Sequence, residues 1–367
     1  MIAVFKSMLM ISIIFILIYT WIVYPGTMFV LAKLRKNQPF TVSAKGSIHQ
    51  SPSSLTIIIP AHNCETTIAK KILNCLSLRH SESSKIIVIS DGSSDRTCDI
   101  VRQSTSNQVE LIELKERSGK SHAQNVAIEQ AVSDFILLTD VDSDLREDAL
   151  EILFDAYMKY PRTGCVGGKI SFNRPNLLQR LYWRFENGLR SAESIAGSLV
   201  SISGAAILMK REHFKLLDKD TGDDMVIPLD LKLDQGLRSI YTDTAIVNDQ
   251  LASKSMDIFN SRRRITSRNC LAISRRKRLL NPLRFPLTSI TLLSHKLLRW
   301  LTPIFGIILA VLVLTKIEWQ PLPVAGIAVI VLFAYLFIPQ VKVFLAETFG
   351  LIAGIADFIR GRTPTYY

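Results

Sequence analysis

Three short motifs that contain aspartate are spaced along the chain, and a run of arginines follows them. The four motifs are Ser90-Asp91-Gly92, Asp140-Val141-Asp142, Gly222-Asp223-Asp224 and Arg262-Arg263-Arg264. The first two directly follow apolar runs at 86–89 and 135–138, and open α/β sheets bind ligands beyond the carboxyl ends of their strands. The order suits a site that holds a nucleotide diphosphate with a divalent metal and uses one further carboxylate as a base.

The motif Asp140-Val141-Asp142 is the sharpest local signal. Its two carboxylates can divide the work, with Asp140 ordering ribose or sugar hydroxyls and Asp142 binding a metal that bridges the diphosphate. Mg²⁺ or Mn²⁺ suits such an oxygen-only site, and would neutralise charge on the departing diphosphate. The alternative is an ordinary pair of aspartates at the end of a strand.

Two further loops are expected at the same edge of the sheet. Pro60-Ala61-His62-Asn63 ends the first strand and Glu65 opens the next helix, although a plain turn capped by Asn63 explains the same residues. Asp91 follows the second strand, where its carboxylate could accept the N3 proton of a uracil ring. The alternative for Asp91 is a helix cap formed with residues 93–95.

Lys120 lies in the sequence Ser118-Gly119-Lys120-Ser121, at the predicted start of a helix. Backbone N–H groups and the helix dipole favour an anion at such a position. The sequence does not match the phosphate-binding loop motif GxxxxGK[ST], so we do not expect an ATPase of that class.

The elements that must position these residues alternate between strands and helices. The predicted order is strand 55–59, helix 65–78, strand 85–89, helix 95–103, strand 109–113, helix 120–131, strand 135–139 and then a helix capped near residue 144, with a later helix over 225–233. Apolar strands alternating with amphipathic helices predict an α/β fold with a mostly parallel sheet covered on both faces. We place this domain at 55–275, after a Pro/Ser/Gln linker at 38–54.

Both ends of the chain are more apolar than a soluble enzyme requires. The 367 residues are 48% hydrophobic, with a mean hydropathy of +0.24. Residues 7–32 carry no charge and are long enough to span a bilayer. A cleaved signal peptide is the alternative, but the apolar run is longer than the core of a typical signal and lacks a clear cleavage site.

The C-terminal region 300–359 predicts two or three more membrane spans. Residues 300–315 and 319–341 form two apolar runs, and 343–359 forms a third that contains Glu347 and Asp357. The third could span, re-enter or lie flat. Residues 282–298 predict an amphipathic helix at the membrane interface with His295 on its surface, which either holds the acceptor side of the site at the membrane or serves only as an anchor.

Positive charge gathers just before the C-terminal membrane region. The net charge is +12, and residues 254–299 contain twelve Lys or Arg and a single acid, Asp257. By the positive-inside rule the domain is cytoplasmic and the protein a multi-pass component of the cell membrane. Membrane lipids and substrate phosphates are the expected partners of these cations. Nucleic acid is not expected, because the block adjoins the membrane and has few aromatic residues for stacking on bases.

Cysteine and histidine spacing predicts no zinc site. The five cysteines are odd in number and none forms a CxxC pair, and the six histidines form no paired-ligand motif. Free thiols in a reducing compartment are therefore expected.

The ordered motifs resemble those of the inverting family 2 glycosyltransferases of GT-A fold, in the membrane-anchored branch that includes cellulose, hyaluronan and poly-N-acetylglucosamine synthases. The resemblance covers 55–271 and is carried by Pro60 to Glu65, Asp91 to Asp95, Asp140-Val141-Asp142, Ser203-Gly204-Ala205 and Gly222-Asp223-Asp224. It implies that a nucleotide-sugar donor, UDP-linked in most such enzymes, lies across the sheet edge. The donor would contact Pro60, Ala61, Asn63, Glu65, Asp91, Lys120, Asp140, Ser203, Gly204 and Arg264, with the metal at Asp142.

The resemblance also implies a base. Asp224 would take a proton from an acceptor hydroxyl as it attacks the anomeric carbon opposite the diphosphate, which inverts the configuration. Asp223 either orients the loop or is the base itself. An N-cap of the following helix is the purely structural alternative for this motif.

One departure from the family concerns the arginine run. Polymer-making members carry Gln-x-x-Arg-Trp, whereas this chain has Ser261-Arg262-Arg263-Arg264-Ile265. Arg264 keeps the guanidinium that meets the diphosphate, but Ile265 removes the aromatic platform for the acceptor sugar. We therefore expect transfer of one or a few sugars to a lipid-linked or saccharide acceptor in cell-surface polysaccharide or glycolipid assembly. A processive synthase and a non-catalytic membrane scaffold are the alternatives.

Overall fold

The computed structural model describes residues 1–36, 54–172, 176–249, 254–315 and 339–362. The proposed linker at 38–54 therefore lies outside the described residues apart from Ser54, and so does most of the apolar run 319–341. All five cysteines are free, as their spacing predicts.

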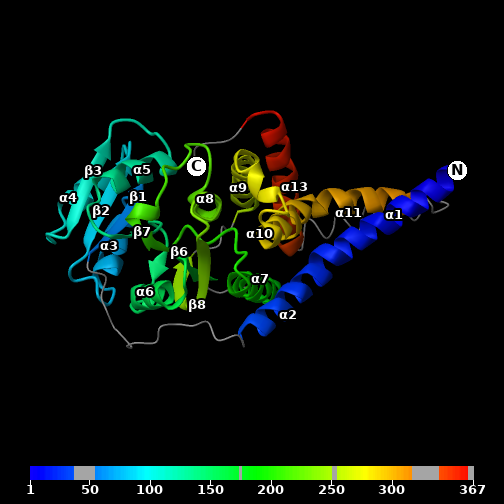
Figure 1. Ribbon diagram of the computed structural model, residues 1–367. Helices are drawn as coiled ribbons and strands as arrows, with labels where there is room; N and C mark the ends of the chain where they lie inside the picture. The colour runs from blue at the N-terminus through cyan, green and yellow to red at the C-terminus, as the bar shows by residue number, and fades with distance from the viewer. Residues whose placement is uncertain (37–53, 173–175, 250–253, 316–338, 363–367) are drawn as a thin grey trace.

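A single eight-stranded sheet forms the centre of the fold (Figure 1). The strands are β1 Leu55–Ala61, β2 Lys85–Asp91, β3 Val109–Leu114, β4 Phe135–Leu138, β5 Asp144–Leu145, β6 Thr163–Phe172, β7 Ile207–Lys210 and β8 Arg238–Asp249. Their order is β3-β2-β1-β4-β7-β6-β8-β5. The pairs from β3 to β4 are parallel, as is β6 with β8, whereas β7 is antiparallel to both of its neighbours. The prediction of a mostly parallel α/β sheet is confirmed.

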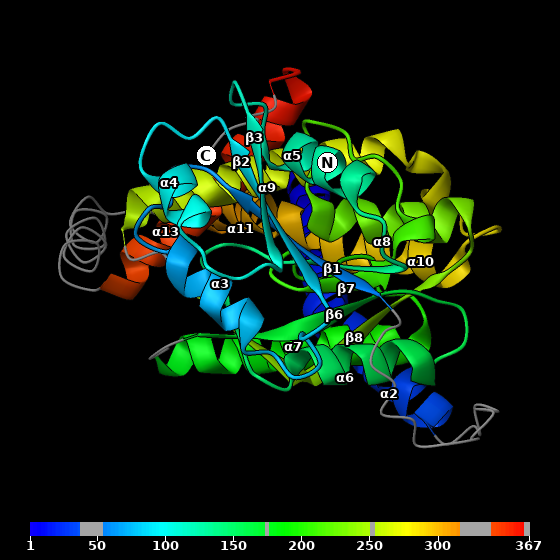
Figure 2. The same ribbon diagram turned by 90° about the vertical axis from the view of Figure 1, so that its left-hand side faces the viewer.

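Helices cover both faces of the sheet (Figure 2). One face carries α3 Ile68–Leu76, α4 Thr97–Arg102 and α6 Ala149–Lys159, and the other carries α5 Lys120–Gln130 and α8 Asp223–Asp234. Helix α7 Leu177–Ala196 packs against β8 and α2. Successive side chains of β1 divide between the two cores, with Ile57 and Ile59 in one and Ile58 in the other. Burial on both faces explains why these strands are continuously apolar instead of alternating.

The predicted strands and helices of the α/β domain lie close to where the sequence placed them, with one exception. A helix was expected from about Asp144, but Asp144–Leu145 forms a short strand paired with β8, and α6 begins only at Ala149. That prediction was wrong because the partner of Asp144 and Leu145 lies about a hundred residues further along the chain, beyond the reach of a local pattern.

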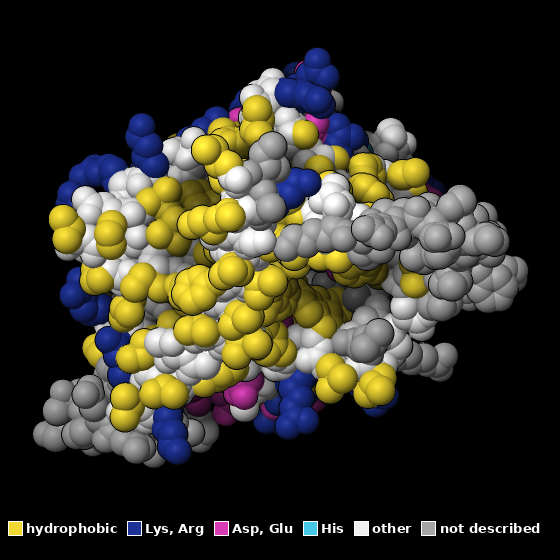
Figure 3. Space-filling view, turned by 90° about the vertical axis from the view of Figure 1, so that its right-hand side faces the viewer, with side chains coloured by type: hydrophobic (Ala, Val, Ile, Leu, Met, Phe, Trp, Pro, Cys, Tyr) yellow, Lys and Arg dark blue, Asp and Glu magenta, His cyan; other side chains and the backbone are white. Residues whose placement is uncertain are grey.

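Among the described residues, two helices are long and apolar enough to cross a membrane, Val4–Arg35 and Pro286–Leu314. The first consists of α1 Ile2–Ile18, a π-helical turn Tyr19–Val23 and α2 Tyr24–Lys36. The two helices lie side by side where they leave the domain (Figure 1), and hydrophobic side chains gather across that end of the molecule (Figure 3). However, α2 packs on α7 through Tyr24, Met28 and Ala32, so the predicted span at 7–32 is partly an internal contact of the protein.

The prediction of a separate interfacial helix at 282–298 was wrong. Residues 286–298 are the first part of the second long helix, formed by α10 Pro286–Thr291, a π-helical segment Leu292–Leu298 and α11 Arg299–Leu314. His295 is buried instead of surface-exposed, with Nδ1 2.6 Å from Oε1 of Glu193. The polar side chains that appeared to define a surface face bind α7 instead, because Arg299 also donates to Glu186 at 2.8 Å.

The last described helix, α13 Pro339–Ile359, packs along α9 Ser255–Arg275. Arg262 donates to Glu347 at 3.1 Å and Arg263 donates to Asp357 at 2.9 Å. The two acids that made 343–359 ambiguous in sequence therefore pair with the arginine run, and α13 is not among the helices apolar enough to cross a membrane.

A buried ion pair fixes α9 against α8. Arg276 donates to the Asp230 carboxylate through Nε and Nη2, each at 2.6 Å. The side chains of Arg276 and Asp230 are both buried. Removing one partner of a buried pair leaves an uncompensated charge, so we expect Arg276→Met to lower the free energy of unfolding by about 3 kcal/mol.

The matched control is Arg102→Met, which removes an exposed pair with Glu113 whose side chains are 52% and 45% exposed. Its cost should be much smaller than that of Arg276→Met, because solvent screens an exposed pair. Urea unfolding of the detergent-solubilised chain measures both, and equal losses of stability would refute the role given to the Arg276 pair.

Candidate active site

The loops after β1 and β2 hold each other by reciprocal hydrogen bonds. The Asn63 side chain accepts from the backbone N–H of Ser94 at 2.8 Å. Glu65 accepts from the backbone of Arg96, and Asp95 accepts from the backbone of Glu65, both at 3.0 Å. Asn63 and Glu65, predicted to contact the donor, thus shape the carboxyl edge of the sheet by pairing two loops, next to Pro60 and Ala61 at the end of β1.

Asp91 fixes the loop that leads into α5. Its two carboxylate oxygens accept hydrogen bonds from the backbone N–H groups of Ser118 at 2.6 Å and Gly119 at 2.8 Å. The adjacent Gly92 has a φ of +63°, and a Cβ there would lie 2.5 Å from the backbone nitrogen of Arg117. Asp91 was predicted to bind a nucleotide base, and in the structure its oxygens position the residues just before Lys120.

Lys120 is the centre of the site. Its ammonium lies 2.6 Å from Oδ1 of Asp140 and 3.0 Å from Oδ2 of Asp223. Gly204 leaves room for this contact, because a Cβ on Gly204 would lie 3.2 Å from Nζ of Lys120 and 3.1 Å from Asp223. Ser203 accepts from the backbone of Ala205 and so shapes the same loop. One cation therefore joins the ends of β4 and α8.

The two acids at the start of α8 differ in their surroundings. Asp223 is buried and accepts from the Gln124 amide at 2.8 Å, in addition to Lys120. Burial alone would raise the pKa of Asp223, but the Lys120 ammonium and the Gln124 amide outweigh it and the pKa is lowered. Among the residues that the structure describes, none donates a hydrogen bond to the Asp224 carboxylate. Burial, and then the neighbouring Asp223 carboxylate, raise the pKa of Asp224.

This difference decides which acid is suited to accept a proton. A base needs an unoccupied oxygen and a pKa nearer to neutrality. Asp224 has both properties, whereas Asp223 is held by a lysine and an amide. The sequence left the choice between them open, and the contacts favour Asp224.

The exposed carboxylate of Asp142 lies beside Asp140 at the end of β4. Loss of hydration, and then the Asp140 carboxylate, raise the pKa of Asp142, so a cation at this point would relieve repulsion. In the described parts of the chain, no group of three or more His, Cys, Asp or Glu side chains is arranged to hold a metal ion. Mg²⁺ is commonly held by one or two carboxylates together with substrate phosphates, and the Asp140–Asp142 loop fits that type of site.

A buried lysine, Lys71, holds the Asp140–Asp142 loop by hydrogen bonds. Nζ of Lys71 donates to Thr139 Oγ1 at 2.8 Å and to the backbone carbonyl of Ser143 at 2.7 Å. Thr139 and Ser143 flank the two aspartates, so Lys71 holds both ends of the loop. Burial lowers the pKa of Lys71, and the carboxylates of Asp140, Asp144 and Asp142 oppose that shift.

Arg268, on α9, reaches the site from the arginine-rich helix. It is buried, and its Nη2 lies 3.2 Å from Ser121 Oγ and also donates to the carbonyl of Thr221. Arg264, which was predicted to meet the diphosphate, lies one helical turn earlier on α9, between Arg263 and the exposed Ile265.

Sequence reasoning missed Lys71, Gln124 and Arg268. Two of them left a detectable signal, because Gln124 is four residues after Lys120 and Arg268 four after Arg264, which places each pair on one face of its helix. Lys71 falls between Ile68 and Ile72 on the apolar face of α3, where a lysine is rare unless it has a partner.

Residues 56–217 match the model of the family described as Glycosyl transferase family 2. Over 187 residues the chain is 28% identical to poly-beta-1,6-N-acetyl-D-glucosamine synthase of Staphylococcus epidermidis, an overlap of 49% of this chain and 45% of the relative. The enzyme of the same name in Staphylococcus aureus strain COL is 27% identical over 185 residues, covering 47% and 45% of the two chains. The chain spans about half the length of the curated relatives it matches.

One solved structure matches nearly the whole chain. It is the mannosyltransferase PcManGT from Pyrobaculum calidifontis, in complex with GDP-Man and Mn²⁺, with a TM-score of 0.74 over 96% of this chain and 99% of that chain. At 21% identity the similarity concerns the fold, and it confirms the expected GT-A-like α/β architecture.

The contrast between Asp223 and Asp224 predicts stability changes of opposite sign. The lowered pKa of Asp223 stabilises the fold at pH values above 3.8, the ordinary pKa of an aspartate, and this stabilisation is lost as the pH falls. The raised pKa of Asp224 means that its ionised form destabilises the fold at neutral pH. At pH 7 we therefore expect Asp223→Asn to lower the thermal midpoint and Asp224→Asn to raise it. Midpoint shifts in the same direction would contradict the assigned surroundings.

Proposed function

Because the chain carries a glycosyl transferase family 2 domain over residues 56–217, as its motifs predicted, we propose that it transfers a sugar from a nucleotide-sugar to a lipid-linked or saccharide acceptor with inversion at the anomeric carbon. The observation that carries this proposal is the Lys120 ammonium bound to both Asp140 and Asp223. The next residue is Asp224, whose carboxylate accepts no hydrogen bond from the described part of the chain. The group combines anion binding with a base at the carboxyl edge of a parallel sheet.

The donor would lie across this edge with its diphosphate near the start of α5. Lys120 and the backbone N–H groups of the first turn of that helix favour a negative charge there. Asp91 holds these groups in place through Ser118 and Gly119. Arg268 and Arg264 on α9 supply further guanidinium groups, whose planar donors suit phosphate oxygens.

Asp142, with Asp140 beside it, would hold a divalent cation at the diphosphate. The cation supplies charge neutralisation of the leaving nucleotide diphosphate. The mannosyltransferase of the same fold is in complex with Mn²⁺, which supports a divalent ion, either Mg²⁺ or Mn²⁺, in this chain.

Asp224 would act on the acceptor. Its carboxylate takes the proton from an acceptor hydroxyl while that oxygen bonds to the anomeric carbon and the bond from this carbon to the diphosphate oxygen breaks. Attack from the side opposite the leaving group inverts the configuration. Asp223 keeps the start of α8 in position through Lys120 and Gln124, and so acts as a positioning residue.

We expect the acceptor to reach the active site at the membrane surface. Two helices are long and apolar enough to span a bilayer, and the basic stretch 254–299 adjoins the second of them, which supports a cytoplasmic domain in the cell membrane. A lipid-linked acceptor would be confined to the same surface as Asp224.

A processive synthase is the second candidate, because the curated relatives are poly-beta-1,6-N-acetyl-D-glucosamine synthases. The exposed Ile265 on α9, in place of an aromatic residue, favours transfer of one or a few sugars. The length of the products made by purified membranes separates the two, since a ladder of long polymer would support the synthase.

The proposal is tested by offering UDP- and GDP-sugars to the purified chain with and without Mn²⁺ or Mg²⁺ and measuring release of nucleotide diphosphate. We expect metal-dependent release with one donor, and a loss of about 10²- to 10⁴-fold in Asp224→Asn because a general base contributes about that much. Asp142→Asn should raise the metal concentration needed for half-maximal release.

Asp155→Asn is the matched control, because Asp155 is an exposed acid on α6, and it should keep wild-type rates. No release with any donor in the panel, or equal rates in Asp224→Asn and Asp155→Asn, would refute the proposal. Release indifferent to EDTA would remove the metal role given to Asp142.

The support of the Asp140–Asp142 loop by Lys71 predicts a selective defect. In Lys71→Met the hydrogen bonds to Thr139 and Ser143 are lost, and we expect the metal requirement and the KM for the donor to rise about tenfold while kcat changes less, since a hydrogen bond to a charged group contributes about 1.5–3 kcal/mol.

Lys70→Met is the control one residue away, because Lys70 is exposed and pairs at the surface with Asp144. It should leave both constants within about twofold of wild type. If Lys71→Met lowers only the thermal midpoint and leaves the metal requirement unchanged, Lys71 has no part in positioning the loop.

A further inference from the structure

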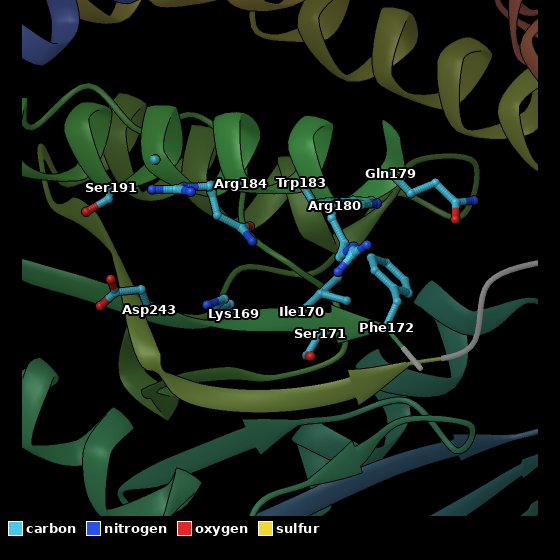
Figure 4. A pocket seen from close by; sticks show the side chains of 12 residues that line it. Lys169, Ile170, Ser171, Phe172, Gln179, Arg180, Trp183, Arg184, Ser191 and Asp243 are labelled. Atoms are coloured by element: carbon cyan, nitrogen blue, oxygen red, sulfur yellow. The ribbon is translucent and has the colours of Figure 1, made fainter. Parts of the chain in front are cut away.

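A cavity of about 510 Å³ lies between α7 and the strands β6 and β8 (Figure 4). Its size falls in the range of small-molecule sites. The cavity shares no lining residue with the group formed by Lys120, Asp140, Asp223 and Asp224. It is therefore separate from the proposed donor site.

The lining of this cavity is positively charged. Lys169 comes from β6 and Arg180 and Arg184 come from α7, against one acid, Asp243. Among the residues that the structure describes, no carboxylate forms an ion pair with any of these three cations. Asp243 lies at the other end of the pocket from Phe172 (Figure 4). Two arginines and a lysine in the lining of one cavity suit an anion with several oxygens, above all a phosphate.

The same cavity offers apolar and polar contacts for a ring with hydroxyl groups. Phe172 and Trp183 stand together at one end, with ring centroids 4.7 Å apart. Asn187 lines the cavity and is 9% exposed, and its buried Oδ1 accepts no hydrogen bond from the described residues. Asn187 therefore adds a polar side chain to the lining of the cavity, and an amide can hydrogen-bond a ligand hydroxyl.

The cavity also lies at the base of the first membrane helix. Gly188 lines it, and a Cβ on Gly188 would lie 3.6 Å from the Phe29 ring of α2. Phe29 belongs to the helix Val4–Arg35 that is long and apolar enough to cross a bilayer. A headgroup in this cavity would thus lie beside the part of that helix that packs on α7.

We propose that this cavity binds a phosphorylated polyol headgroup, with the phosphate on Arg180, Arg184 and Lys169 and the ring between Trp183 and Asn187. The source is either a membrane lipid or a soluble sugar phosphate, which share this chemistry. The site does not depend on sugar transfer, and its ligand need not be a substrate.

Calorimetric titration of the full chain in detergent tests the proposal with two probes of the same headgroup, inositol 1-phosphate and dioctanoyl-phosphatidylinositol. Dioctanoyl-phosphatidylcholine serves as the lipid without the polyol. We expect saturable binding of at least one inositol probe that UDP does not displace and that persists in Asp224→Asn. Binding of the lipid probe alone identifies a membrane source, and binding of both identifies a site for the headgroup itself.

The decisive comparison is between two double variants that lose the same charge. Arg180→Gln with Arg184→Gln should weaken binding at least about tenfold, whereas Arg278→Gln with Arg284→Gln, at exposed positions outside the cavity, should stay within about twofold. Trp183→Leu should also weaken binding, which a simple charge effect would not produce. The proposal is overturned if neither inositol probe binds, if phosphatidylcholine binds equally well, or if the two double variants bind alike.

Discussion

The ion pairs of Lys120 are the interaction on which the rest of the site depends. A single ammonium contacts the carboxylates of Asp140 and Asp223, which come from the ends of two elements more than eighty residues apart. Two acids brought this close would repel each other without a cation between them. The position of Lys120 is itself fixed, because Lys120 is the first residue of α5 and Asp91 binds the backbone N–H groups of the two residues before it. The carboxyl edge of the sheet is thus assembled around one positive charge.

The same arrangement separates the roles of neighbouring acids. Asp223 gives its oxygens to Lys120 and Gln124 and stays ionised, and its charge in turn raises the pKa of Asp224. Beyond α8, the buried pair of Arg276 with Asp230 joins this helix to α9, and His295 and Arg299 join the second long helix to α7. Buried polar contacts thereby hold both α9 and the second long helix against the domain.

The sequence patterns correctly predicted the features that depend on interactions between residues close in sequence. The apolar strands, the helix start at Lys120 and the acids at strand ends follow from burial and turn chemistry, which residues close in sequence control. The errors share a cause, because each depended on a partner distant in sequence. Asp144 and Leu145 pair with β8, and His295 is buried against Glu193. Lys71 was missed for the same reason, because its partners Thr139 and Ser143 lie about seventy residues further along the chain.

The pH dependence of kcat/KM for nucleotide diphosphate release, compared between the wild-type chain and Lys120→Met, tests the central role of Lys120 most directly. The Lys120 ammonium lowers the pKa of both Asp223 and Asp224, so its removal should raise the pKa of the base. The account predicts that the acidic limb of the profile moves to higher pH in Lys120→Met, in addition to a lower maximum. A profile that falls in height but keeps its acidic limb at the wild-type pH would contradict it.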